Sequence, residues 1–309
     1  MREEALELKK TGETRNRKKY LMSNRFKDNL WGYFFIAPTI IGLVALNLYP
    51  VIKTMYLSLL RSSGIGRYKF VGLENYMELV KDPEVVHATK NTVLYTLMVA
   101  PLAVFLSLVV AVLLNSNIKL KSIYRTIYFI PVVSAPAAIA MVWKWLYNTK
   151  FGLLNQVLGV EISWLSNPNL ALLSIAAVGV WSLIGYNMII FLAGLQEIPD
   201  MYYEAAKIDG ANKFTQFFKI TLPLISPSLF FVTVTTVMGS LKVFDLIFMM
   251  TAETSPIFNR VQTLVVLFYR QAFVMNQKGY ASAIVVLLLI IIILITIIQM
   301  KLQKKWVHY

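Results

Sequence analysis

The chain has 309 residues, of which 57% are hydrophobic and only 15% are charged, well under the roughly 25% charged residues usual in soluble domains. It has no cysteine, which excludes disulfides, thiolate nucleophiles and cysteine-ligated metals, and its two histidines stand far apart in the sequence. A net charge of +14 is compatible with nucleic-acid binding, but the distribution of the basic residues argues against it.

Six uncharged runs can each supply the roughly 20 residues that cross a hydrocarbon core of about 30 Å. They cover residues 29–52, 91–118, 126–143, the latter part of 162–196, 220–241 and 279–300. None alternates like a barrel strand, so we expect an all-α integral membrane protein of about six transmembrane helices. The first run is too long for a signal-peptide core and follows a polar segment, so it should remain as the first helix.

Lysine and arginine are unevenly distributed between these runs. With the amino terminus inside, the inner segments 1–28, 115–125, 196–226 and 301–309 hold 18 of them in 79 residues, whereas the outer segments hold 11 in 92. The positive-inside rule therefore predicts a multi-pass cell-membrane protein, bacterial or archaeal, with both termini in the cytoplasm. Basic residues next to the first helix then orient the chain and contact anionic lipid, and no nucleic-acid partner is expected.

In chain order, we expect a cytoplasmic basic lead-in over residues 1–28 and one six-helix transmembrane domain over residues 29–309. The helices are expected at about residues 30–50, 91–114, 126–143, 170–195, 227–250 and 279–300. The third helix should be kinked at Pro131 and Pro136. Residues 53–90 are expected to form an outer loop.

The longest inner segment has the pattern of a compact helix–turn–helix. Asp200 stands where it can cap the first helix, and Gly210 stands where a left-handed helix stop is needed. Asn212 can cap the second helix, and Pro223 marks its end. The segment also carries more apolar residues than a solvated connector needs, so this surface should face a helix end, the lipid interface or a partner protein.

The same segment carries a widely spaced pattern: Glu204-Ala205-Ala206, three residues, Gly210, nine residues, then Ile220-Thr221-Leu222-Pro223. Every fixed position and spacing matches the EAA signature loop, so the chain resembles the permease subunits of type I ABC importers. Further similarity to the carbohydrate-uptake (maltose or multiple-sugar) branch lies at residues 70–76, 91–92, 151–155, 208–211, 244–245 and 279–283. One departure is Ala252-Glu-Thr-Ser-Pro256, where the family often has a Gly-Gly-Pro turn.

The resemblance implies that this chain and a second, homologous permease form a heterodimeric pore. Each inserts its loop into a groove on a cytoplasmic ATPase dimer, and an extracytoplasmic binding protein delivers the substrate. The chain has no phosphate-binding G-x-x-x-x-G-K-[ST] loop, so ATP and Mg²⁺ should bind the ATPase and this chain should be a transport subunit without cofactor or metal. The residues implied in coupling are Glu204, Ala205, Ala206, Asp209, Gly210, Ile220, Leu222 and Pro223.

Lys242 and Asp245 form the only charged pair within a predicted span. Because a charge in mid-membrane is costly, they should either pair with each other one turn apart or face the substrate path. The polar and aromatic candidates beside that path are Trp181, Tyr186, Asn187 and Ser240. The expected cargo is an oligosaccharide, and Lys242 raises the hypothesis of a uronate-containing one, because a cation can replace water around a carboxylate. Glycerol-phosphate is the alternative within the same branch.

Two other classes of protein fit the sequence less well. A membrane-embedded glycosyltransferase-like enzyme needs paired carboxylates or an acidic metal motif, for which Glu74 and Glu78 are not convincingly arranged. A secondary transporter predicts inverted repeats, which the sequence does not show. Gly179, Gly185 and Gly194 are expected to allow close helix packing rather than to shape a site.

Overall fold

The computed structural model describes residues 29–62, 68–116, 118–251 and 255–307. Its contacts divide the chain into two units, Met1–Tyr56 and Leu57–Tyr309. The predicted lead-in of residues 1–28 lies outside the described residues.

The first unit is described over its helical part only. A continuous helix, Asn29–Ser58, contains a π-helical turn η1 (Val44–Leu48), followed by α2 (Tyr49–Ser58). The prediction that this helix ends near Pro50 is wrong. The wider π turn lies directly before the proline and gives its ring room beside the preceding carbonyls, so the helix continues.

The segment predicted as an outer loop is largely ordered. Strands β1 (Leu60–Ser62) and β2 (Tyr68–Phe70) pair antiparallel, and helix α3 (Glu74–Lys81) follows them. The Asn75 amide fastens α3 to the hairpin by donating to the carbonyls of Ser58 (2.7 Å) and Leu60 (2.9 Å).

The second long helix, α4 (Pro83–Asn115), begins eight residues before the predicted position 91. Its start is capped by Asp82, whose carboxylate accepts the Glu84 amide at 2.8 Å. The sequence Asp82-Pro83-Glu84 is a regular helix start, and it lies before the apolar run.

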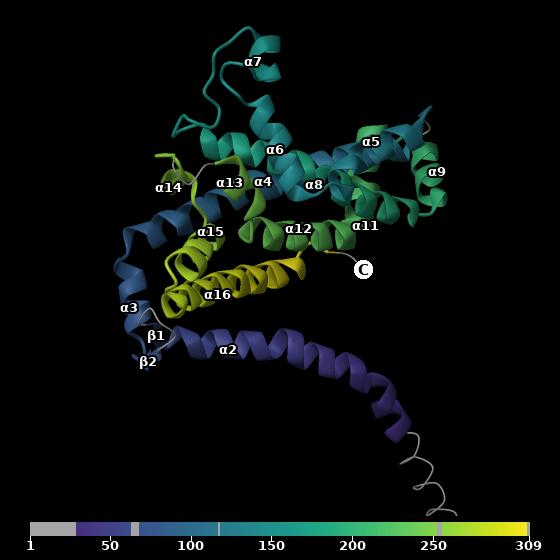
Figure 1. Cartoon of the computed structure of the whole chain (residues 1–309). Helices are drawn as coiled ribbons and strands as arrows, with labels where there is room; N and C mark the ends of the chain where they lie inside the picture. Colours follow the sequence, from purple (N-terminus) through teal and green to yellow (C-terminus); the bar gives the residue numbers. More distant parts are fainter. Residues whose placement is uncertain (1–28, 63–67, 117, 252–254, 308–309) are drawn as a thin grey trace, which may run out of the picture. The chain divides into compact units, whose positions relative to one another are not determined.

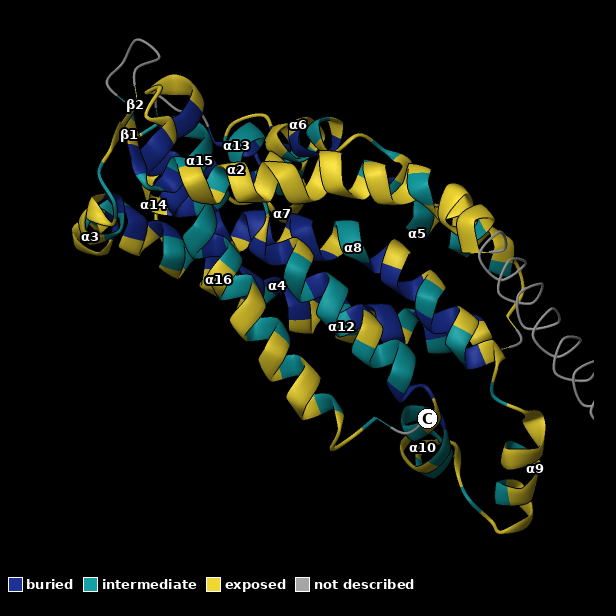
Figure 2. Cartoon of the chain, turned by 90° about the horizontal axis from the view of Figure 1, so that it is seen from below, coloured by how far each residue is buried: buried dark blue, intermediate teal, exposed yellow. Residues whose placement is uncertain are grey.

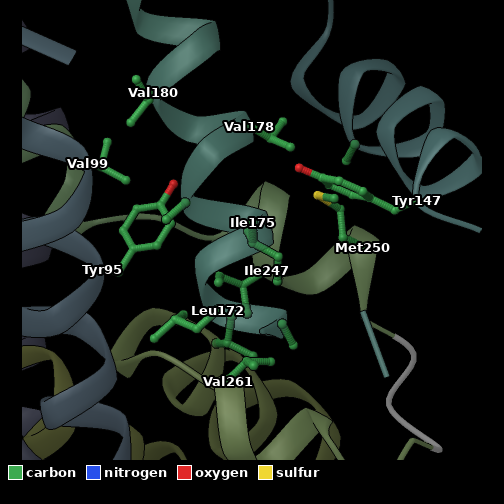
Figure 3. Close-up of a cluster of buried hydrophobic side chains, with 14 of the residues drawn as sticks. Tyr95, Val99, Tyr147, Leu172, Ile175, Val178, Val180, Ile247, Met250 and Val261 are labelled. Atoms are coloured by element: carbon green, nitrogen blue, oxygen red, sulfur yellow. The ribbon is translucent and has the colours of Figure 1, made fainter. Parts of the chain in front are cut away.

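Helices α4 and α8 (Ala171–Gln196) form the centre of the second unit, and α12 (Ser226–Leu241) packs against both (Figure 1). Their contact is close because the side chains between them are small. A Cβ at Gly179 would collide with the Tyr95 hydroxyl, which confirms close packing at this glycine, but Gly179 also lines the cavity described below. Figure 3 shows the buried cluster here, with Tyr95 and Val99 of α4 facing α8.

The third predicted span is two helices rather than one kinked helix. Helices α5 (Lys121–Val133) and α6 (Pro136–Leu146) meet at 103°. The break falls at Ser134 and Ala135 because the residue before Pro136 is driven to extended geometry; Ala135 has ψ 130°. Pro131 stays inside α5, so only one of the two predicted kinks forms a break.

The remaining helices complete the second unit, and among them α16 agrees closely with the predicted span at residues 279–300. They are α7 (Leu153–Leu158), α9 (Asp200–Ile208), α10 (Lys213–Gln216), η2 (Phe217–Thr221), α11 (Leu222–Leu224), α13 (Asp245–Met250), α14 (Phe258–Val261), α15 (Leu264–Tyr269), η3 (Arg270–Val274) and α16 (Lys278–Gln303). Four helices among the described residues are long and apolar enough to cross a membrane, or six if each of two bent pairs is one span.

Candidate coupling loop and translocation cavity

The inner segment after α8 folds as the predicted helix–turn–helix, with one correction. Asp200 is the first residue of α9 rather than its cap; the cap position is Pro199, which has no side-chain cap hydrogen bond. The Asp200 carboxylate therefore lies in the first turn, where its negative charge stabilises the helix by interacting with the positive end of the helix dipole.

The end of α9 is a Schellman turn built on Gly210, which has φ +77°. The Gly210 amide donates to the Lys207 carbonyl at 3.1 Å, and the Ala211 amide donates to the Ala206 carbonyl at 2.8 Å. These two bonds define the motif and need a left-handed residue at the turn. The predicted left-handed stop is confirmed, and Asp209 lies at the helix cap beside it.

The second helix of the loop is fixed to the first. The Asn212 carboxamide oxygen accepts the Thr215 amide at 2.8 Å, which confirms the predicted cap. The hydroxyls of Tyr203 and Thr221 lie 2.9 Å apart and join α9 to η2. Pro223 lies inside α11, and the bend of 68° into α12 follows at Ile225. The Tyr203–Thr221 contact therefore links the two helices of the loop.

Helix α9 is exposed at every residue except Tyr203 and Ala206. Met201, Glu204, Ala205 and Ile208 are spaced as neighbours on one helical face, and all four are exposed, Ile208 to 88%. Tyr203 and Ala206, on the other side, are half-buried. Figure 2 shows α9 at the margin of the unit, coloured mostly as exposed. An apolar stripe with a carboxylate at its centre is suited to a groove on another protein.

A second candidate site is a cavity of about 260 Å³ between α4, α8 and the α12–α13 junction. Three of the predicted path residues line it: Ser240, Lys242 and Asp245. Tyr95 and Ser182 line it as well and were not predicted, because a lone Tyr or Ser in an apolar run carries no spacing signal.

The predicted fifth helix is broken at this cavity. Helix α12 ends at Leu241 and α13 begins at Asp245, so Lys242 and Asp245 are not one turn apart on a single helix. No ion pair joins these two described side chains, both of which are exposed. The break places Lys242 at the carboxyl end of α12 and Asp245 in the first turn of α13. Each charge therefore lies at the helix end whose dipole has the opposite sign.

Ser240 contributes an unsatisfied polar atom to the same cavity. Its side chain is 4% exposed, and its hydroxyl has no hydrogen-bond partner in the described part of the chain. A buried hydroxyl without a partner is costly, and a solute in the cavity would reach this one only after the Ser240 side chain moved.

The other three predicted path residues do not line the cavity. Asn187 is buried and donates to the Thr236 hydroxyl at 3.0 Å, which ties α8 to α12. Trp181 packs edge-on against Trp143 with ring centroids 5.4 Å apart. Tyr186 is 47% exposed. Within the described residues, no group of three or more acidic or histidine side chains is arranged for a metal ion.

Comparison with known proteins places the chain in a family. A family model described as "Binding-protein-dependent transport system inner membrane component" matches residues 92–308. The probable ABC transporter permease protein YesP of Bacillus subtilis is 36% identical over 92% of this chain and 93% of its own length. The lactose transport system permease protein LacF of Rhizobium radiobacter is 33% identical over 82% of this chain and 87% of its own length.

Solved structures share the fold. A bacterial ABC transporter involved in the import of the acidic polysaccharide alginate contains a chain that matches with a TM-score of 0.81 at 18% identity, covering 92% of this chain and 98% of that one. A bacterial alginate ABC transporter in complex with an alginate pentasaccharide-bound periplasmic protein matches with a TM-score of 0.79 at 19% identity, covering 88% and 93%. The predicted type I importer permease fold is confirmed.

These relatives are permease proteins, so the transport assignment holds and the glycosyltransferase alternative finds no support. Permease relatives and several apolar spans together make this a multi-pass membrane protein. The chain belongs to the family of binding-protein-dependent transport system inner membrane components, as a permease subunit of an ABC transporter related to the carbohydrate-uptake permeases.

Proposed function

We propose that this chain and a second, homologous permease form the pore of an ATP-driven importer for an oligosaccharide. A binding protein delivers the cargo from outside, and residues 196–226 dock on a cytoplasmic ATPase dimer that binds ATP and Mg²⁺. Both termini then lie in the cytoplasm. The exposed face of α9 supports this proposal most directly, because it combines apolar side chains with Glu204 on a helix whose end is rigidly fixed.

The docking face suggests a division of roles. Ala205 is small enough for close approach, Met201 and Ile208 supply apolar area, and Glu204 can offer a carboxylate to a basic residue of the ATPase. The Schellman turn and the Tyr203–Thr221 contact transmit a displacement of α9 to η2 as a unit. From η2 the chain runs through Ile220, Leu222 and Pro223 into α12, which leads to the cavity.

A cross-linking experiment tests the docking. Since the chain has no cysteine, Ile208→Cys introduces a single thiol at the most exposed residue of the face. A short bifunctional reagent should join it to the ATPase in the assembled transporter. Lys150→Cys, an exposed position in the segment before α7, is the matched control and should give no ATPase adduct. Equal yields at both positions, or none at position 208, would contradict the docking proposal.

The cavity leads us to propose an anionic cargo. Lys242 and Asp245 both line it without forming an ion pair with each other, and the Ser240 hydroxyl has no partner in the described residues. A neutral sugar needs only hydroxyl, amide and aromatic groups, whereas a carboxylate or phosphate gains from a cation that replaces its water. Relatives named for lactose and for sn-glycerol-3-phosphate show that names alone do not decide between neutral and anionic cargo.

Uptake by a Lys242→Gln variant tests the anionic cargo. Under the proposal, uptake of a uronate-containing oligosaccharide falls about tenfold or more, since a charge-assisted contact contributes about 1.5–3 kcal/mol. A neutral analogue should be affected far less. Lys150→Gln, which removes an exposed cation away from the cavity, is the control and should leave both rates unchanged. Unchanged uptake of the acidic cargo, with assembly and basal ATPase activity intact, would refute the proposal.

A further inference from the structure

A groove between α5 and α8 lies outside both sites described above. It has a volume of about 370 Å³ and is lined by Arg125, Thr126, Phe129, Ile189, Leu192, Ala193 and Gln196. The two helices pack against each other, and Figure 1 shows α5 beside α8 in the region from which α9 emerges.

The groove contains a cation without a counter-ion. Arg125 is half-buried, and its Nε atom is fully buried with no hydrogen-bond partner in the described residues. No carboxylate lines the groove, and Glu197, the nearest acid in sequence to Gln196, makes no ion pair with Arg125 where the structure describes both. The carboxyl end of α8 explains why a cation is stable here, since its last carbonyls carry partial negative charge.

The lining changes from polar to apolar in one direction on both helices. On α5, Arg125 stands in the first turns and Phe129 lies one turn further along. On α8, Gln196 is the last residue, and Leu192 and Ile189 lie one and two turns before it. Because both polar ends belong to the segments predicted as cytoplasmic, the gradient runs from the membrane surface towards the hydrocarbon. A phospholipid has the same order, with its phosphate above its acyl chains.

We propose that this groove binds one anionic phospholipid of the cytoplasmic leaflet. Arg125 and Gln196 contact its phosphate, and its acyl chains pass Phe129, Leu192 and Ile189. The inference rests on the proposed topology. It gives the lipid a place at the start of the coupling loop, because Gln196 is the first residue of segment 196–226.

Native mass spectrometry of the assembled transporter tests the site by lipid titration, without a transport measurement. Wild-type protein should bind phosphatidylglycerol more tightly than phosphatidylcholine. Arg125→Gln should weaken the tightest phosphatidylglycerol binding about fivefold, the change expected for one cation near an anionic lipid surface. Lys119→Gln, which removes a neighbouring exposed cation, should leave it within twofold, roughly the scatter of such contacts.

A second variant separates lipid binding from folding. Ala193→Leu retains the guanidinium and fills the groove, so it too should weaken phosphatidylglycerol binding, and it carries the test if Arg125→Gln does not assemble. Three lipid-binding results would overturn the proposal: wild-type-like lipid affinity in both variants, no preference for phosphatidylglycerol in the wild type, or full displacement of the lipid by inorganic phosphate. The last result would identify a free-anion site. Loss of ATPase subunits from Arg125→Gln with unchanged lipid binding would identify a protein contact instead and equally overturn it.

Discussion

Replacement of Gly210 separates backbone strain from steric fit in the coupling loop. A Cβ at Gly210 would meet nothing within 4 Å, so the cost of a side chain here comes from the backbone alone. The residue has φ +77°, and an L-residue in the left-handed region costs roughly 1–2 kcal/mol. If Gly210→Val destabilises the docking conformation of the loop by this 1–2 kcal/mol, the affinity of the permease for its ATPase should fall roughly 5- to 30-fold.

The assay is retention of the ATPase by the permease in a titration of purified components. Gly210→Asn should lose much less affinity, since asparagine tolerates the left-handed conformation. Gly159→Val is the matched control, because Gly159 also has a positive φ (+64°) and open space but ends α7, away from the loop. The reasoning is refuted if Gly210→Val binds the ATPase like the wild type, or if Gly159→Val weakens binding equally.

Two other predictions concern packing and topology. A Cβ at Gly185 would collide with the Tyr128 backbone carbonyl. Gly185→Ala should therefore destabilise the α5–α8 contact by about 1–3 kcal/mol and lower the midpoint of thermal unfolding. An unchanged midpoint would contradict this prediction, because it would show that the two helices move apart without a cost in stability. In sealed cells, an impermeant thiol reagent should label Glu74→Cys and spare Lys207→Cys, whereas the reverse pattern would overturn the cytoplasmic placement of the coupling loop.

The features that the sequence predicted correctly are those for which a single position accepts only a few residue types. Gly210 and Asn212 were assigned correctly because a left-handed stop and an amide cap each have a narrow choice of residues. The long apolar runs were found for a similar reason, since the bilayer sets their length. In the same way, the expected close packing at Gly179 follows from the absence of a side chain.

The breaks within spans were predicted less well. Pro136 breaks a span while Pro131 remains inside α5, and local sequence does not distinguish the two. The break at residues 242–244 contains neither glycine nor proline, so nothing marked it, and the expected Lys242–Asp245 pair depended on a continuous helix. The cavity lining also depends on which residues of separate helices face one another, as Tyr95 of α4 and Ser182 of α8 do here. That information lies in tertiary packing.

The coupling role of α9 is tested most directly by Glu204→Lys in the complete transporter, reconstituted with its ATPase and binding protein. Glu204 is exposed, so the reversal leaves the fold of the chain intact and places a like charge against the proposed basic partner. We predict that the pore subunits still insert and pair, while cargo uptake and cargo-stimulated ATP hydrolysis are both lost. Normal uptake together with normal stimulated hydrolysis would contradict the assignment.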